Sequence, residues 1–238
     1  AIQQTGGETM KHEHLEEAGG LSFGAFFARW MRFRREDMLA MLSFPVGFWL
    51  LLLAVVLIAG AVEGTADPEA LGIPVALALV GGVFAGFIVG VGSAGVCFTL
   101  AVCWGQPRRY GVAALWLSGI LYGALNLLLA AVLQGAVRLF APGSLDLLGR
   151  LPLVLWLALL IGPTAASVVV KAVLRRFGPK AGGWLYLVFM IFCIGIPNLD
   201  NVRGMDLRPA LFAVLAVGLV AAGAVGSRWL LRTPVGND

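Results

Sequence analysis

Residues 97–122 read CFTLAVCWGQPRRYGVAALWLSGILY, which is an apolar run, a short basic turn and a second apolar run. Gly105 and Pro107 interrupt a helix, because glycine is conformationally loose and proline lacks the N–H that an α-helix uses. Arg108 and Arg109 are costly to leave in hydrocarbon, and basic residues of short loops remain on the cytoplasmic side. The stretch therefore predicts two membrane-spanning helices joined by a tight cytoplasmic turn, where a cytoplasmic partner can push on the membrane part.

The composition indicates an integral membrane protein. Of the 238 residues, 60% are hydrophobic and 13% are charged, so the chain is too apolar for a soluble domain and too long for a simple anchor. The net charge of +4 does not indicate a nucleic-acid partner, because basic residues in such a chain report the orientation of the spans. Cys97, Cys103 and Cys193 lie in or at the end of apolar runs, so we interpret them as small hydrophobic residues rather than a disulfide or metal set.

The hydrophobic runs predict the fold class, an all-α integral membrane protein with six transmembrane helices. A helix needs about 20 apolar residues to cross the hydrocarbon, and every run except the fifth is long enough. The second run is longer than one crossing requires. The six runs are residues 44–62, 71–104, 110–137, 151–174, 182–197 and 209–231.

The amino-terminal part differs from the rest in composition. The first nine residues, AIQQTGGET, do not begin with Met and look like the end of a ubiquitin-like fusion tag. The expected organisation is a tag remnant at 1–9, a polar tail at 10–21, an interfacial elbow helix at 22–42, a six-helix transmembrane domain at 43–232 and a C-terminal tail at 233–238.

The expected elbow helix is amphipathic. Aromatic side chains recur with helical spacing at Phe23, Phe26, Phe27 and Trp30, and Ser22 is a suitable N-cap. An aromatic face beside clustered arginines suits a helix that lies in the cytoplasmic interface and contacts membrane lipid. The alternative is a juxtamembrane extension whose arginines act as stop-transfer charges.

The distribution of Lys and Arg predicts that both termini are cytoplasmic. With the amino terminus inside, the external loops hold four of the 17 basic residues, Arg138, Arg150, Arg203 and Arg208. The other 13 fall in cytoplasmic segments and are Lys11, Arg29, Arg32, Arg34, Arg35, Arg108, Arg109, Lys171, Arg175, Arg176, Lys180, Arg228 and Arg232.

No catalytic set is recognisable in the sequence. The only histidines, His12 and His14, lie in a polar tail, and no carboxylate lies well inside a predicted span. A GxxxxGK[ST] phosphate-binding loop is also missing from the sequence. We therefore expect a chain that is not an enzyme and that binds no metal or cofactor.

The third predicted span carries one polar stripe, formed by Ser118, Tyr122 and Asn126 at successive helical turns. The stripe either lines a translocation path or hydrogen-bonds to a neighbouring helix, and both interpretations remain open. Small residues also recur one turn apart, which favours close helix packing, at Gly82, Gly86, Gly90, Gly119 and Gly123.

A second basic turn follows the fourth predicted span. Its sequence, KAVLRRFGPKAGG at 171–183, again combines an arginine pair, an aromatic residue, Gly and Pro. With these two turns, the chain resembles the permease subunits of small bacterial ABC exporters of the type 2 exporter-like group, which includes toxin-peptide and bacteriocin exporters. The resemblance covers the layout of residues 22–232, and its motifs are Gly-x-x-Arg-Arg in the first turn and Arg-Arg-Phe-Gly-x-Lys in the second.

This resemblance implies that the first turn couples the permease to a separate ATPase and that the second turn makes a further contact. The implied coupling residues are Gly105, Gln106, Pro107, Arg108, Arg109, Tyr110, Arg175, Arg176, Phe177, Gly178 and Lys180. The resemblance also implies a partner, namely two copies of an ABC ATPase that carry ATP and Mg²⁺. The permease itself is expected to pair with a second copy or with a homologous permease, to work by alternating access and to lie in a bacterial cell membrane.

The predicted wall of a pathway is mostly aliphatic, so we expect an amphipathic peptide or a lipid-like compound as cargo, as in bacteriocin export or immunity. The alternative function is a substrate-capture membrane component of an importer, which also has six helices. Such a component needs several convergent polar groups, and the sequence offers few. A membrane enzyme is disfavoured by the missing acid, base and metal ligands.

Overall fold

The computed structural model describes residues 21–63, 68–144, 148–149, 151–187 and 208–232, and this part of the chain is helical and contains no strand. The helices are α2 (Phe23–Phe33), α3 (Arg35–Glu63), the 3₁₀ helix η1 (Pro68–Gly72), α4 (Ile73–Cys103), α5 (Arg108–Phe140), α6 (Leu153–Phe177) and α8 (Arg208–Arg232).

Five of these helices, α3, α4, α5, α6 and α8, are long and apolar enough to cross a membrane. This agrees with a multi-pass membrane protein, and each of these helices coincides with one predicted apolar run. For the remaining run, 182–197, residues 182–187 are helical and the rest lies outside the described residues. The sixth span therefore stays a prediction. The segments 1–20, with both histidines, and 233–238 also lie outside the described residues.

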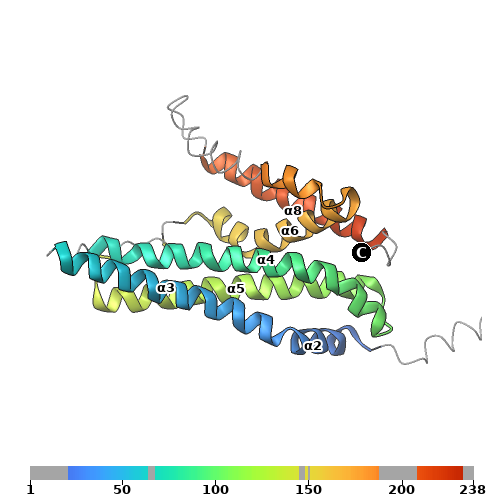
Figure 1. Ribbon diagram of the computed structural model, residues 1–238, viewed down its shortest axis with the longest axis horizontal. Helices are drawn as coiled ribbons and strands as arrows, with labels where there is room; N and C mark the ends of the chain where they lie inside the picture. Colours follow the sequence, from blue (N-terminus) through green and yellow to red (C-terminus); the bar gives the residue numbers. More distant parts are fainter. Residues whose placement is uncertain (1–20, 64–67, 145–147, 150, 188–207, 233–238) are drawn as a thin grey trace, which may run out of the picture.

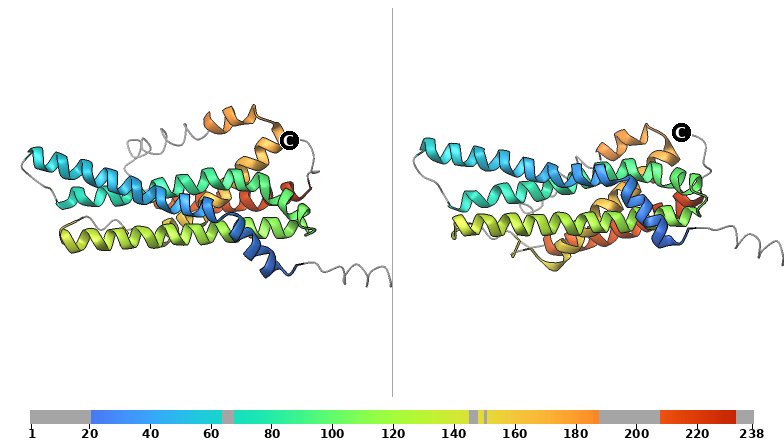
Figure 2. Two further views of the ribbon diagram at one scale, coloured as in Figure 1. Left: turned by 60° about the horizontal axis from the view of Figure 1, so that its bottom comes forward. Right: turned by 90° about the horizontal axis from the view of Figure 1, so that it is seen from below.

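The long helices form two groups. α3, α4 and α5 lie side by side, and α6 and α8 pack against each other next to them (Figures 1 and 2). α3, α4 and α5 are successively antiparallel, whereas α6 runs parallel to α4, since Gly90 lies against Ser167 and Gly95 against Lys171. α8 in turn runs parallel to α6. The cytoplasmic-type turns predicted from sequence are thereby brought to one end of the molecule.

The helix predicted at 22–42 ends earlier in the structure than the sequence predicted. Ser22 is the N-cap, as predicted, and its hydroxyl accepts a hydrogen bond from Ala25 N at 3.4 Å. The helix ends at Phe33, with Arg34 as the C-cap, and residues 35–42 open α3 instead. Two acidic residues in the first turn of α3, Glu36 and Asp37, favour a helix start at this point, because carboxylates stabilise the positive end of the helix dipole.

The largest buried cluster lies at the end of the molecule where α2 packs. Phe26 and Trp30 of α2 are fully buried there, in one cluster with residues of α4, α5, α6 and α8. The buried cluster includes three alanines of α4 and α5, Ala94, Ala101 and Ala114, and small residues let helices approach closely inside a membrane. The aromatic face of α2 is therefore covered by protein.

The glycine stripe of α4 and the polar stripe of α5 pack against each other. A Cβ atom on Gly86 would fall 2.3 Å from Cε1 of Tyr122, and a Cβ on Gly82 would overlap Asn126. Each polar side chain therefore fills the space that a missing Cβ leaves open. The prediction that the glycines serve helix packing is confirmed at these two positions.

Candidate functional site

The described basic residues gather at one end of the molecule. α2, the start of α3, the α4–α5 turn and the ends of α6 and α8 all lie there (Figure 2). Arg138, at the carboxyl end of α5, and Arg208, at the start of α8, are at the opposite end. This distribution places both predicted coupling turns on the same face, and it makes this end the candidate functional site.

The α4–α5 turn is tightly structured by backbone hydrogen bonds. Gln106 N donates to Ala101 O at 2.8 Å and Gly105 N donates to Val102 O at 2.9 Å. Together they form a Schellman motif, which requires the positive φ of 66° that Gly105 adopts. Pro107 is then the N-cap of α5.

The segment 106–110, which the resemblance implies as part of the coupling contact, combines an extended link with the start of a helix. Arg108, Arg109 and Tyr110 belong to the first turn of α5, and Gln106 and Pro107 precede it as an extended link. Proline is favoured at such a start because its missing N–H needs no partner there. The residues of the turn are thus continuous with a spanning helix.

Gln106 ties this turn to the segment before α2. Its side chain is buried, and its amide pairs with the backbone of Leu21 when Nε2 donates to Leu21 O (3.1 Å) and Oε1 accepts from Leu21 N (3.0 Å). A primary amide has one donor side and one acceptor side, so both are satisfied by a single residue. The entry to α2 and the α4–α5 turn therefore form one unit.

Aromatic contacts extend this unit along α2. The ring of Phe23 meets Tyr110 edge to face at 5.3 Å between centroids, and Phe26 meets Trp104 at 5.5 Å. The guanidinium carbon of Arg29 lies 4.7 Å from the centre of the Trp104 ring. We call α2 together with residues 104–110 the clamped turn. The aromatic pattern of α2 is visible in the sequence, where it predicts a helix facing membrane lipid, but in the structure it packs on Trp104 and Tyr110.

The outer side of the clamped turn faces away from the protein. Pro107 and Arg109 are exposed, whereas Arg108 is half-buried and makes further contacts. Arg108, Arg109 and Pro107 thus form a short basic surface. The opposite side of the same turn is held by its contacts with Leu21 and α2.

The second predicted turn lies at the same end but packs on a different neighbour. Arg176 stacks on Trp229 of α8 at 4.8 Å and on Phe177 at 5.8 Å. Gly178 ends α6 with a positive φ of 76°. Phe177 and Lys180 are exposed and line an open hollow of about 390 Å³. Two structured turns therefore offer basic and aromatic groups on one face, one supported by α2 and the other by α8.

The polar stripe of α5 is buried and hydrogen-bonded within the chain. Tyr122 Oη donates to Gly82 O (2.8 Å) or Met41 O (3.1 Å), and Asn126 Nδ2 donates to Leu79 O at 3.4 Å. These contacts favour the interhelical interpretation of the stripe.

Ser118 links the stripe to α2. Its hydroxyl donates to Leu115 O at 3.1 Å and accepts a bond from Trp30 Nε1 at 3.3 Å. The only polar atom of the Trp30 side chain is thereby satisfied within the bundle.

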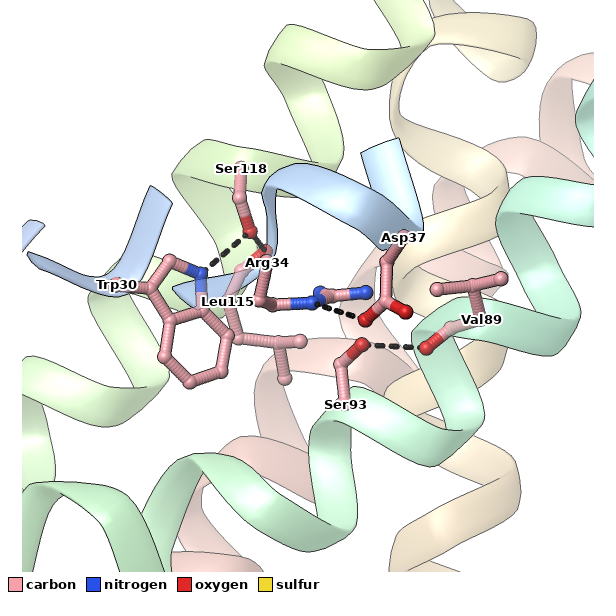
Figure 3. Close-up of polar contacts among 7 residues, drawn as sticks. All are labelled: Trp30, Arg34, Asp37, Val89, Ser93, Leu115 and Ser118. Carbon is pink, nitrogen blue, oxygen red and sulfur yellow. Dashed lines mark hydrogen bonds and ion pairs between the residues drawn. The ribbon is translucent and has the colours of Figure 1, made fainter. Parts of the chain in front are cut away.

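Sequence reasoning missed Arg34, which was counted only as a topogenic charge. Its side chain turns into the bundle at the α2–α3 bend and is 8% exposed (Figure 3). Nε donates to Asp37 Oδ2 at 3.2 Å, and the guanidinium carbon lies 5.6 Å from the centre of the Trp30 ring. Desolvation lowers the pKa of Arg34, while the hydrogen bond and charge of Asp37 oppose this shift. The sequence signal was a carboxylate three residues after an arginine at a helix boundary.

No known family, curated protein or solved structure matches this chain.

Proposed function

We propose that the chain is the membrane-spanning permease subunit of an ATP-driven exporter and that a separate ATPase binds its basic end. The clamped turn is the observation that carries this proposal. A force on Arg109 from outside cannot be absorbed by a flexible loop, because Gln106 pairs with Leu21 just before α2 and Tyr110 packs on Phe23 of α2. The force would therefore reach α4, α5 and α2 together.

In this proposal, ATP and Mg²⁺ belong to the ATPase, and this chain supplies no catalytic group. Two ATPase copies close on ATP and push the clamped turns of two permease chains. The turn on α6, from Arg175 to Lys180, is a second contact. Alternating access follows if the push reorients α4 and α5 relative to the partner chain.

The transport pathway is proposed to lie between two chains. The polar stripe of α5 is committed to backbone groups of the same chain, so it does not supply a polar path through one subunit. The outward sides of α3 and α5 are aliphatic, with Leu50, Val55, Leu128 and Val132 exposed. Such a surface suits an amphipathic peptide or a lipid-like compound as cargo.

The proposal is tested with the ATPase that is encoded beside this chain. Both proteins are expressed together and purified, and binding, ATPase activity and cargo-stimulated turnover are measured for wild type and for Arg108→Glu/Arg109→Glu. We expect this double charge reversal to lower the yield of the complex or the cargo-stimulated ATPase turnover at least about tenfold. Charged residues at the rim of an interface govern association, and changing two neighbouring charges gives a larger effect than changing one.

Arg232→Glu is the matched control. Arg232 is exposed at the same end, on α8, and lies outside both turns. We expect it to bind and couple as wild type does. If the reversal of Arg108 and Arg109 leaves binding and coupling unchanged, the exporter proposal is wrong. Binding of one small polar molecule without any ATPase would favour the capture component instead.

A further inference from the structure

The carboxyl end of α6 and the helical segment that follows it form a corner. α6 ends at Phe177, the backbone turns at Gly178, and residues 181–187 are helical again. A Cβ atom on Gly182 would lie 3.6 Å from Cδ2 of Leu174, so the segment turns back beside the last turns of α6. Both views of Figure 2 place this corner at the outer edge of the bundle, where it is accessible to membrane lipid.

An open hollow of about 390 Å³ lies in this corner. Among the described residues its lining is apolar apart from one lysine, and it consists of Val173, Phe177, Lys180, Ala181, Trp184 and Leu185. The side chains of Phe177 and Trp184 are 63% and 72% exposed, so the protein leaves most of their ring surface uncovered. Such an apolar surface is stabilised when an apolar partner covers it.

The hollow lies at the level of the lipid headgroups. Arg175 and Arg176 are in the last turn of α6, and charged groups are costly in hydrocarbon, so this end of the span is kept at the membrane surface. Trp184 and Tyr186 are both more than half exposed, and such aromatic residues are typical of the boundary between headgroups and acyl chains. An acyl chain can therefore reach the hollow from the adjacent leaflet.

The charge around the hollow is positive. Residues 151–187 contain no Asp or Glu and four basic residues, Lys171, Arg175, Arg176 and Lys180. The guanidinium carbon of Arg176 lies over Trp229 of α8, whereas Lys180 is exposed and lines the hollow. A lysine places its ammonium group among headgroups while its aliphatic stem lies along apolar surface. An anionic headgroup is therefore favoured here over a zwitterionic one.

We propose that the hollow binds one anionic phospholipid, with an acyl chain against Phe177 and Trp184 and the phosphate group at Lys180. A soluble anion would leave the apolar lining uncovered. A zwitterionic lipid would gain less from Lys180, because its own cation offsets its phosphate. The bound lipid would hold the second basic turn at the membrane surface. The inference does not depend on the exporter proposal, which the clamped turn carries.

The test measures lipid binding by native mass spectrometry. The full chain is purified in a nonionic detergent without any ATPase and titrated with phosphatidylglycerol or phosphatidylcholine of identical acyl chains. We expect the first phosphatidylglycerol to bind about fivefold more tightly, which is the preference that one lysine near a headgroup provides. Equal affinities for the two lipids would show only unselective lipid contact and would overturn the site.

Two variants separate the headgroup from the acyl chain. Lys180→Gln should reduce the preference to less than about twofold and leave phosphatidylcholine binding unchanged. Trp184→Ala should weaken the binding of both lipids about three- to tenfold, because the ring covers the chain. Both side chains are exposed, so neither change should disturb the fold. Arg232→Gln and Tyr186→Ala are the matched controls, since both residues are exposed at the same end and do not line the hollow.

Three results would overturn the proposal. Lipid binding that is unchanged in both Lys180→Gln and Trp184→Ala would place the lipid elsewhere on the chain. A loss of preference in Arg232→Gln as large as that in Lys180→Gln would assign the selectivity to the basic end in general. Displacement of the lipid by glycerol phosphate, which has the phosphate group but no acyl chain, would identify a soluble anion as the ligand.

Discussion

Gly111 shows how one missing methyl group sets the distance between two spanning helices. A Cβ at this position would lie 2.6 Å from the backbone oxygen of Cys97 on α4. A backbone atom in a helix cannot rotate away, so any larger residue must push α5 from α4. Because both helices also support the clamped turn, this contact affects the candidate site as well as the fold.

We predict that Gly111→Ala destabilises the protein by about 1–3 kcal/mol, because overpacking of a tight contact has this cost. The unfolding midpoint in mixed micelles titrated with a denaturing detergent measures the effect. Gly92→Ala on α4 is the control, because a Cβ there meets no atom within 4 Å. Alanine in a helix interior is favoured over glycine by roughly 0.5–1 kcal/mol, so the control should be neutral or stabilising. Equal effects of the two variants would contradict the packing argument.

At the residue scale, the sequence predicted the stripes but not their partners. Gly82 and Gly86 were recognisable from spacing, as were Tyr122 and Asn126. Their pairing depends on the register between α4 and α5, which hydropathy does not determine. Arg34 was hidden for a related reason, since a charge next to a span normally remains in solvent or headgroups, and only the bend at Phe33 turns it inward.

At the element scale, the sequence predicted that α2 is a helix and where it begins. It did not predict where α2 ends or that α2 packs against protein. Ser22 and the aromatic spacing identified the helix, yet an aromatic face suits lipid headgroups and a protein groove equally well. Phe26 and Trp30 are in fact fully covered by the bundle. The α4–α5 turn was predicted from Gly105 and Pro107, whereas the pairing of Gln106 with Leu21 joins distant segments and left no local signal.

We predict that Trp30→Ala releases α2 from the bundle. Truncating a fully buried Trp costs about 3–5 kcal/mol, and it also removes the bond to Ser118. Limited trypsin digestion of the protein in nanodiscs should then cut at Arg29 or Arg32 at least about tenfold faster, because local unfolding governs cleavage of exposed helical sites.

Leu39→Ala is the control for this experiment. Leu39 lies at the start of α3 and is 60% exposed, so its truncation should leave the digestion rate of α2 unchanged. If Trp30→Ala is digested at the wild-type rate, the aromatic docking of α2 does not hold the clamped turn.

At the scale of the whole molecule, hydropathy was sufficient for the main architecture. Runs of about 20 apolar residues coincide with α3, α4, α5, α6 and α8, because a chain in hydrocarbon must satisfy its backbone hydrogen bonds within each helix. The neighbours of each helix were not predictable, since lipid and protein offer similarly apolar contacts. The bend between α2 and α3 and the parallel packing of α6 on α4 both depend on which neighbour each helix packs against.

Most described basic residues lie at one end of the molecule, and this predicts how the protein is oriented in the membrane. Arg109 lies at this end, in the clamped turn, and Gly143 lies exposed after α5 at the opposite end. In a variant whose three native cysteines are replaced by alanine, we predict that Arg109→Cys reacts with a membrane-impermeant maleimide only in inverted vesicles. Gly143→Cys should react only in intact cells, because short basic loops are retained in the cytoplasm. Labelling of Arg109→Cys in intact cells would place the basic end outside, and an ATPase could then not reach the clamped turn.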